Sequence, residues 1–183
     1  MLNTRVERFI RLLQEDIKLR QRCNIGRGSS RSVYEFGDMV IKLPCGFFQD
    51  DVDDMGILQS KKEIDVWCGC GPMQRKLLAS MYAYGEIDNV PYIVMEKITV
   101  AEDVDCSPQI ANYEIADYAQ KHGFRIVKNY WRILNHLIGR FNLKEADLFE
   151  NAGNFGITKD KKIVLCDYGF CGWSQNSYGY DEF

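Results

Sequence analysis

The sequence has 183 residues, of which 46% are hydrophobic and 27% are charged, and its formal net charge is −3. This length and composition predict one globular domain with a hydrophobic core. The weakly negative charge gives no electrostatic reason to expect a nucleic acid or an anionic membrane as a partner. No apolar run approaches the roughly 20 residues of a membrane-spanning helix, and the charged N-terminus does not resemble a signal peptide. We therefore expect a cytoplasmic protein with reduced cysteines.

The chain begins with a predicted helix over residues 4–21. Thr4 and Glu7 have the spacing of a capping box at its start. Apolar residues recur on one face at helical spacing, namely Val6, Phe9, Ile10, Leu13 and Ile17. This pattern is typical of a helix that packs against a core and carries no chemistry.

Residues 24–43 predict a β-hairpin with a glycine-rich tip. Gly26 and Gly28 form a G-x-G turn, one strand contains Val33, and the next strand contains Lys42 among apolar residues. Because no helix begins after the glycines, the pattern differs from the Walker and dinucleotide-binding types. Backbone N–H groups at such a tip can close over phosphates, which a lysine on the next strand can reach. Alone, a G-x-G turn is a weak signal, since ordinary hairpins contain it too.

A loop and a helix are predicted to follow this hairpin. Residues 44–56 read as a loop, whose acidic cluster lacks the ligand pattern of a calcium-binding loop. A helix is predicted over residues 57–68 and carries Glu63 beside an apolar face. A lysine in an apolar strand needs a partner if its end is buried. We therefore predict an ion pair between Lys42 and Glu63, with Asp65 as the rival partner.

The middle of the chain predicts two strands and then two helices. A strand over residues 80–84, a turn at Asp88-Asn89 and an apolar strand ending in Met95-Glu96 come first. Residues 99–108 read as an irregular acidic linker. Two helices are predicted over residues 109–121 and 124–141, split at Gly123. The second has the apolar spacing of a buried central helix.

The last informative stretch is residues 147–170. Asp147 begins a loop rich in glycine and asparagine, which leads to Asn154 and a short hairpin ending at Asp167-Tyr168-Gly169. A hairpin brings its ends together, so the side chains of Asn154 and Asp167 can converge. Carboxylate and amide oxygens are ligands of the kind that Mg²⁺ takes beside phosphate oxygens.

Taken together, these motifs resemble the protein-kinase-like superfamily, and in size the small, reduced proteins of phage and bacterial type. Asp167-Tyr168-Gly169 stands where the family has D-F-G, and Asn154 precedes Asp167 by the family's usual thirteen residues. The match to the glycine-rich loop is partial, because Arg31 replaces its third glycine. The resemblance covers residues from about 24 to 170. Only thirteen residues follow Phe170, so we expect the peptide-binding half of the large lobe to be absent.

The resemblance implies an α+β fold class, a compact two-lobe protein-kinase-like fold in one domain over residues 1–183. Its N-lobe, to about residue 96, would be a small antiparallel sheet with one helix. A hinge over about residues 96–99 would lead to a reduced helical C-lobe over about residues 100–183. ATP and Mg²⁺ are the implied cofactors. The implied ATP-binding residues are Gly26, Gly28, Val33, Lys42, Glu63, Met95, Glu96 and Ile98, and the implied metal ligands are Asn154 and Asp167.

The implied catalytic residues are Asp147 and Lys42, but the loop around Asp147 departs from the family's pattern. The family places its catalytic Asp five residues before the Asn, and here that position is Phe149. Either the loop carries two extra residues and Asp147 keeps the role, or the catalytic Asp is missing. We predict the insertion, with Glu150 as a substitute for Asp147.

The implied function is that of an ATP-dependent phosphotransferase, expected to act as a protein Ser/Thr kinase. The acceptor would be the hydroxyl of a protein or of a small molecule. The alternative is a pseudokinase, a catalytically inactive module that binds a nucleotide or inhibits a partner protein. Phe149, Arg31 and the missing substrate platform favour that alternative. Neither function calls for a nucleic acid or a membrane.

Overall fold

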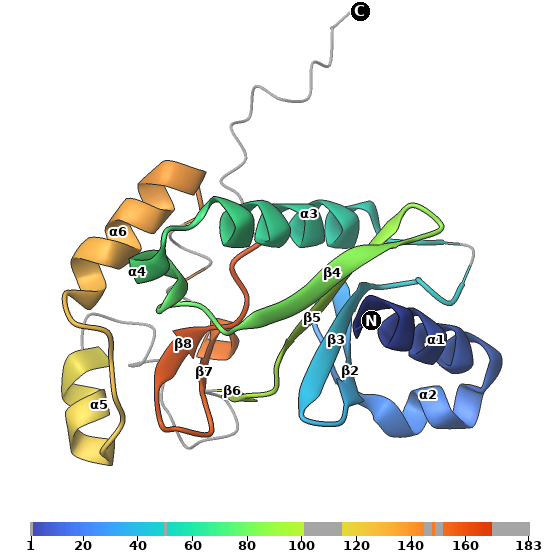
Figure 1. Ribbon diagram of the computed structural model, residues 1–183, viewed down its shortest axis with the longest axis horizontal. Helices are drawn as coiled ribbons and strands as arrows, with labels where there is room; N and C mark the ends of the chain where they lie inside the picture. The colour runs from blue at the N-terminus through green and yellow to red at the C-terminus, as the bar shows by residue number, and fades with distance from the viewer. Residues whose placement is uncertain (1, 50, 101–114, 145–147, 149–151, 170–183) are drawn as a thin grey trace, which may run out of the picture.

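The computed structural model describes residues 2–49, 51–100, 115–144, 148 and 152–169. The protein has a mixed α+β architecture, with antiparallel sheets and several helices, as the sequence predicted at this level (Figure 1). None of the helices in these ranges has the length and apolar character needed to cross a membrane.

The N-terminal region forms two helices, so the single helix predicted over residues 4–21 is wrong. Helix α1 spans Leu2–Glu15 and helix α2 spans Ile17–Cys23. Asp16 separates them in an extended conformation, and its carboxylate accepts a hydrogen bond from the N–H of Leu19 at 3.0 Å. A capping aspartate thus starts a new helix where the pattern suggested continuity. Because α1 already begins at Leu2, Thr4 lies inside its first turn and is not its cap.

A five-stranded antiparallel sheet follows in the order β1-β2-β3-β5-β4. Its strands are β1 (Asn24–Arg27), β2 (Arg31–Phe36), β3 (Met39–Pro44), β4 (Met81–Ile87) and β5 (Val90–Glu96). Both predicted hairpins are confirmed. Asp88 and Asn89 join β4 to β5 with φ angles of 52° and 66°, as a tight hairpin turn requires.

Helices cover both faces of this sheet (Figure 1). Helix α3 (Asp54–Gly69) packs on one face, and α1 packs on the other. Successive residues of a strand alternate between faces, so Val40 and Lys42 face α3 while Ile41 joins the cluster around α1. Helix α3 begins three residues before the predicted start, because the carboxylate of Asp53 caps it by accepting a hydrogen bond from the N–H of Met55. A short helix, α4 (Pro72–Arg75), leads into β4.

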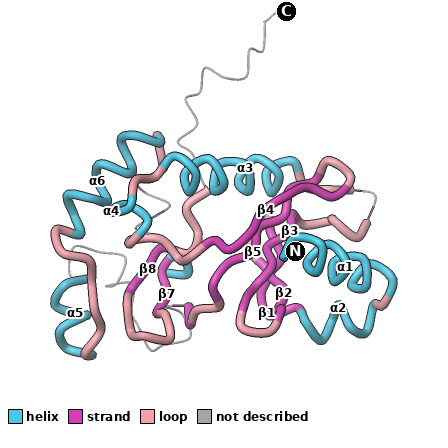
Figure 2. The backbone as a smooth tube through the Cα atoms, in the orientation of Figure 1, coloured by secondary structure: helices cyan, strands magenta, loops and turns pink. Residues whose placement is uncertain are grey.

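The rest of the chain builds a second, smaller sheet with two helices beside it (Figure 2). The strands β6 (Thr99–Val100), β7 (Phe155–Ile157) and β8 (Ile163–Leu165) pair in the order β6-β7-β8. A short 3₁₀ helix, η3 (Ala152–Asn154), precedes β7. Strand β6 was predicted as irregular linker, and the remainder of that linker lies outside the described residues.

Of the two helices predicted in this region, the second is shorter in the structure, and the first is described only from residue 115. Helix α5 spans Ile115–His122, and residues 109–114 lie outside the described ranges. Helix α6 spans Tyr130–Phe141, so the predicted start at residue 124 is wrong. Asn129 has a φ of 60°, which a continuous right-handed helix excludes. Arg125 instead bridges to the β7–β8 turn, where its N–H donates to the carbonyl of Lys161 at 2.7 Å.

One hydrophobic cluster joins the two sheets. It includes Val40, Val66, Met95, Leu134, Leu137, Phe155, Val164 and Tyr168. Backbone hydrogen bonds reinforce this junction: the N–H of Leu165 donates to Leu77, and the N–H of Ala79 donates to Leu165, both at 2.7 Å. The buried face of α6 agrees with the predicted central helix. The sheets are therefore fixed against each other by a shared core and by main-chain contacts.

We predict that Gly56→Ala destabilises the fold. A Cβ atom at Gly56 in α3 would lie 2.2 Å from the carbonyl oxygen of Ser30, so the helix would have to move away from the β1–β2 turn. Such overpacking lowers the free energy of unfolding by about 1–3 kcal/mol, measurable by urea denaturation. Gly139→Ala in α6 is the matched control, because that position is open and alanine favours the helix by up to about 1 kcal/mol. Equal losses in both variants would contradict the prediction.

Candidate functional site

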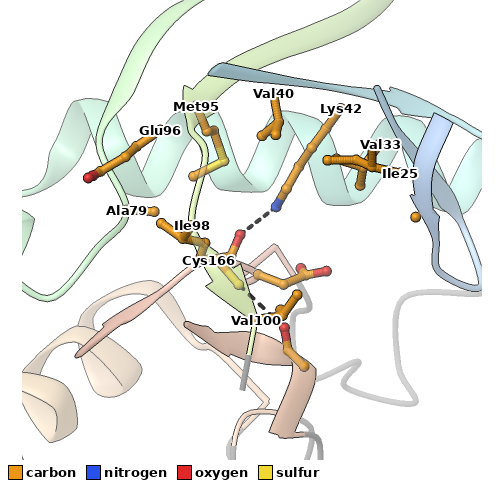
Figure 3. A pocket seen from close by; sticks show the side chains of 13 residues that line it. Ile25, Val33, Val40, Lys42, Ala79, Met95, Glu96, Ile98, Val100 and Cys166 are labelled. Atoms are coloured by element: carbon orange, nitrogen blue, oxygen red, sulfur yellow. Dashed lines mark hydrogen bonds between the residues drawn. The ribbon is translucent and has the colours of Figure 1, made fainter. Parts of the chain in front are cut away.

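A cavity of about 170 Å³ lies between the five-stranded sheet and the β6–β8 sheet (Figure 3). Its walls are mainly apolar. Lys42 and Asp167 lie at one end, and Glu96 lies on the opposite side from Lys42 (Figure 3). The lining residues are Ile25, Gly26, Val33, Val40, Lys42, Ala79, Met95, Glu96, Ile98, Val100, Gly153, Cys166 and Asp167. An apolar slot with a few polar groups at one end is the usual form of a small-molecule site.

Strand register explains why these side chains face one another. Val33 of β2 is paired with Lys42 of β3, and Val40 of β3 is paired with Met95 of β5. Directly paired residues of neighbouring strands project on the same face of a sheet. The alternation that predicted these strands therefore also directs Lys42 and the apolar residues toward the cavity.

Lys42 and Glu63 form the predicted ion pair. The Nζ atom of Lys42 lies 2.9 Å from Oε1 of Glu63, whose side chain is fully buried. The same Nζ donates a hydrogen bond to the carbonyl oxygen of Cys166 at 2.5 Å, as Figure 3 shows. Asp65 is exposed on the opposite side of α3, which rules it out as the partner. Lys42 is thus held at the cavity wall from two directions.

Arg31 is a member of this site that sequence reasoning treated only as a departure from a motif. Its guanidinium donates through Nη1 to Oε2 of Glu63 at 2.6 Å and through Nη2 to Oδ1 of Asp167. The side chain of Arg31 is only 4% exposed. Its position in the sequence could have predicted this role. Arg31 lies two residues before Val33 on β2, so both side chains project from the same, inward face of the strand.

The four charged groups form a network of two cations and two carboxylates, in which Lys42 pairs with Glu63 and Arg31 joins Glu63 to Asp167. Burial alone would lower the pKa of Arg31, but the attraction of Asp167 and Glu63 outweighs it and raises that pKa. Burial likewise tends to raise the pKa of Asp167, yet Arg31 and then Lys42 hold it below its usual value. Both groups therefore stay charged at neutral pH. Removing one partner from a buried charge network costs about 3–5 kcal/mol, because the other charge is left uncompensated.

The triplet Asp167-Tyr168-Gly169 packs directly against α3. Tyr168 is buried, and its N–H lies 3.4 Å from Oε1 of Glu63. A Cβ atom at Gly169 would lie 2.3 Å from the carbonyl oxygen of Gln59. Only glycine permits this close approach. Glu63 therefore connects β2, β3, α3 and the segment after β8 at one point.

The two predicted metal ligands meet through the backbone. The N–H groups of Cys166 and Asp167 lie 2.8 and 3.4 Å from the carbonyl oxygen of Asn154, so the ends of the hairpin converge as expected. The side chain of Asn154 is buried and does not line the cavity, and the carboxylate of Asp167 is engaged by Arg31. In this arrangement the two residues do not fit a Mg²⁺ ion. Within the described ranges, no group of three or more His, Cys, Asp or Glu side chains could hold a metal ion either.

The other predicted site residues divide into three sets. Gly26, Val33, Met95, Glu96 and Ile98 line the cavity. Gly28 does not line it, and its N–H closes the β1–β2 turn by donating to the carbonyl of Arg31 at 2.8 Å. The predicted catalytic Asp147, with Phe149 and Glu150, lies outside the described residues.

Cys166 is a cavity residue that the sequence did not single out. Burial raises the pKa of its thiol to about 12, so the thiol is protonated at neutral pH. Its Sγ lies 3.3 Å from the carbonyl oxygen of Gly153, and it contributes a weakly polar wall rather than a nucleophile.

The arrangement can accept an apolar group whose anionic end lies near Lys42. Compared with models of known protein families and with curated proteins, the chain gives no match. Assignment of a ligand therefore depends on the geometry and chemistry of these residues.

We predict that Glu63→Ala destabilises the protein by about 3–5 kcal/mol, because Arg31 and Lys42 would then share only Asp167 as a counter-charge. Urea denaturation at neutral pH measures the change. Asp65→Ala, an exposed acidic position on the same helix, is the matched control and should stay within about 0.5 kcal/mol of the wild type. A loss of less than about 1 kcal/mol in Glu63→Ala would contradict the importance of the network.

Proposed function

We propose that the chain is a compact two-lobe kinase-like protein that binds ATP in this cavity and transfers its terminal phosphoryl group to a hydroxyl. The five-stranded sheet with α3 would be the N-lobe, and the β6–β8 sheet with α5 and α6 would belong to a reduced C-lobe. The acceptor would be a protein serine or threonine, or a small-molecule hydroxyl.

The fixed position of Lys42 carries this proposal. Its ammonium group lies at the polar end of an apolar slot, paired with Glu63 and hydrogen-bonded to the carbonyl of Cys166. An immobilised ammonium is suited to phosphate oxygens. The adenine base would fill the slot between Val33, Val40 and Met95. In the kinase-like superfamily, a strand lysine paired with a helix glutamate has this same task.

The segment after β5 supports an adenine-binding hinge at Ile98 more than at Glu96. The N–H of Glu96 donates to the carbonyl of Ser80 at 2.8 Å, and that of Lys97 donates to Asp38 at 3.4 Å. Both donors are thus already engaged within the protein. Ile98 lines the cavity, so we propose that backbone groups around it meet the adenine edge.

Transfer to an acceptor would depend on positioning and on neutralisation of phosphate charge. Asp147 is proposed to orient the acceptor hydroxyl, and Lys42 to hold the phosphates. The contact between Arg31 and Asp167 favours a second candidate function, a module that binds the nucleotide without transferring phosphate.

ATP is predicted to stabilise the wild-type protein. At 100 times the dissociation constant the gain is about 2.7 kcal/mol, which corresponds to a rise in melting temperature on the order of 5–10 °C for a domain of this size. Thermal melts in buffer containing MgCl₂ measure it. Lys42→Ala should abolish the rise, because the phosphates lose their ammonium partner. Lys159→Ala removes a surface lysine that pairs with Asp38 and should leave the rise intact. No rise in the wild type would contradict the nucleotide site.

Asp147→Asn is predicted to lose turnover by on the order of 10²-fold or more, as removal of a general base does. ATP affinity should barely change, because Asp147 would contact the acceptor rather than the nucleotide. Transfer of labelled phosphate to cell-lysate proteins measures the activity, with Glu150→Gln as the comparison. Normal turnover in Asp147→Asn with loss in Glu150→Gln would move the role to Glu150. A wild type that binds ATP but transfers to no acceptor would favour the second candidate function.

A further inference from the structure

We propose that Arg31 takes the place of a divalent cation in this site, so that the cavity binds its nucleoside triphosphate equally well with and without Mg²⁺. The inference rests on the proposed nucleotide site. It adds that the metal-free nucleotide is a ligand of this site, and that Arg31 allows it to bind.

The guanidinium group of Arg31 lies between two carboxylates. Arg31 holds Glu63 with one terminal nitrogen and Asp167 with the other. A planar fork can bridge two carboxylates in this way, whereas an ammonium group acts as a single point charge. Of the two partners of Arg31, Asp167 is the one that lines the cavity, and its side chain is 42% exposed. Arg31 thus neutralises the negative charge that phosphate oxygens would otherwise meet at this wall.

The charges of this network are balanced. With Arg31 in place, the cations Arg31 and Lys42 match the carboxylates Glu63 and Asp167. A divalent cation at Asp167 would meet the positive charge of Arg31, whose Nη2 contacts Oδ1, and displacing Arg31 would leave two buried cations on the single carboxylate of Glu63. Both cations have almost no exposed surface, at 4% and 9% of their side chains. The displacement is therefore unfavourable, and the network as it stands needs no added cation.

Without Arg31, the charges of the site would no longer be balanced. Glu63 would keep Lys42 at 2.9 Å, so no buried charge loses its last partner. Asp167 would become a partly exposed carboxylate with no guanidinium on it. That carboxylate would repel a free triphosphate and would be available to a divalent cation bound to the phosphates. Arg31→Ser is thus expected to fold and to acquire a dependence on Mg²⁺.

The test is the dissociation constant of ATP, measured by isothermal titration calorimetry in excess EDTA and in excess MgCl₂. For the wild type we expect the two constants to agree within about threefold, and for Arg31→Ser we expect binding in EDTA to be weaker by about tenfold or more, given the strength of a nearby like charge. In the double variant Arg31→Ser/Asp167→Asn the difference should disappear, because the repelling carboxylate is gone. Arg27→Ser, an exposed arginine of the same hairpin, is the matched control and should behave as the wild type.

The outcomes separate this inference from the nucleotide site itself. Wild-type binding that requires MgCl₂, or an Arg31→Ser variant that remains indifferent to Mg²⁺, would overturn the role of Arg31 and leave the nucleotide site standing. No ATP binding by the wild type in either buffer would overturn the proposed function. Should Arg31→Ser fail to fold, the wild-type comparison between EDTA and MgCl₂ decides the question by itself.

Discussion

The buried carboxylate of Glu63 is the group on which the arrangement of this protein depends. It accepts hydrogen bonds from Lys42 and Arg31, and the N–H of Tyr168 approaches it as well. Taking a carboxylate out of water costs several kcal/mol, and the cost is offset only when the partners have good geometry. Those partners come from β2, β3 and the segment after β8. Their positions are therefore restricted together, and a shift of any one of them exposes the others to an unpaired charge.

This restriction explains how a short chain can position a site between two small sheets. Helix α3 lies against the five-stranded sheet, and Gly169 lies close against its backbone at Gln59. The apolar cluster continues through this region from Val66 to Phe155. Apolar packing determines which surfaces meet, while the charged network determines their register. The two together place the ammonium group of Lys42 at the end of the cavity.

The sequence predicted those parts of the fold that follow from local pattern. Alternation and turn residues located both hairpins of the large sheet, and an apolar strand with one lysine led to the Lys42–Glu63 pair. Local pattern failed where one residue overrode its neighbours. Asp16 starts a second helix by capping it, and Asn129, with its left-handed backbone, delays α6 to Tyr130. The spacing of apolar residues cannot predict either of these helix starts, since each depends on the backbone conformation of a single residue.

Within the site, the sequence identified residues that match a motif and overlooked one that does not. Arg31 replaces a glycine of the motif, yet its two carboxylate partners, Glu63 and Asp167, lie 32 and 136 residues further along the chain. No local window contains both Arg31 and Asp167. The backbones of Asn154 and Asp167 approach each other, but only the side chain of Asp167 lines the cavity. This difference likewise arises from the packing of the folded protein.

The main-chain contacts of Leu165 with Leu77 and Ala79 have a consequence for ligand binding. They join the segment that enters β4 to the last strand of the small sheet, on the side of the cavity where Ala79 and Cys166 form its wall. Two sheets tied in this way have little freedom to hinge apart. Binding in a preformed cavity costs less free energy than binding that must first order two mobile parts of a protein. Selectivity in such a slot comes from shape and charge already in place, so ligands that are too large are excluded at entry instead of being accommodated by opening.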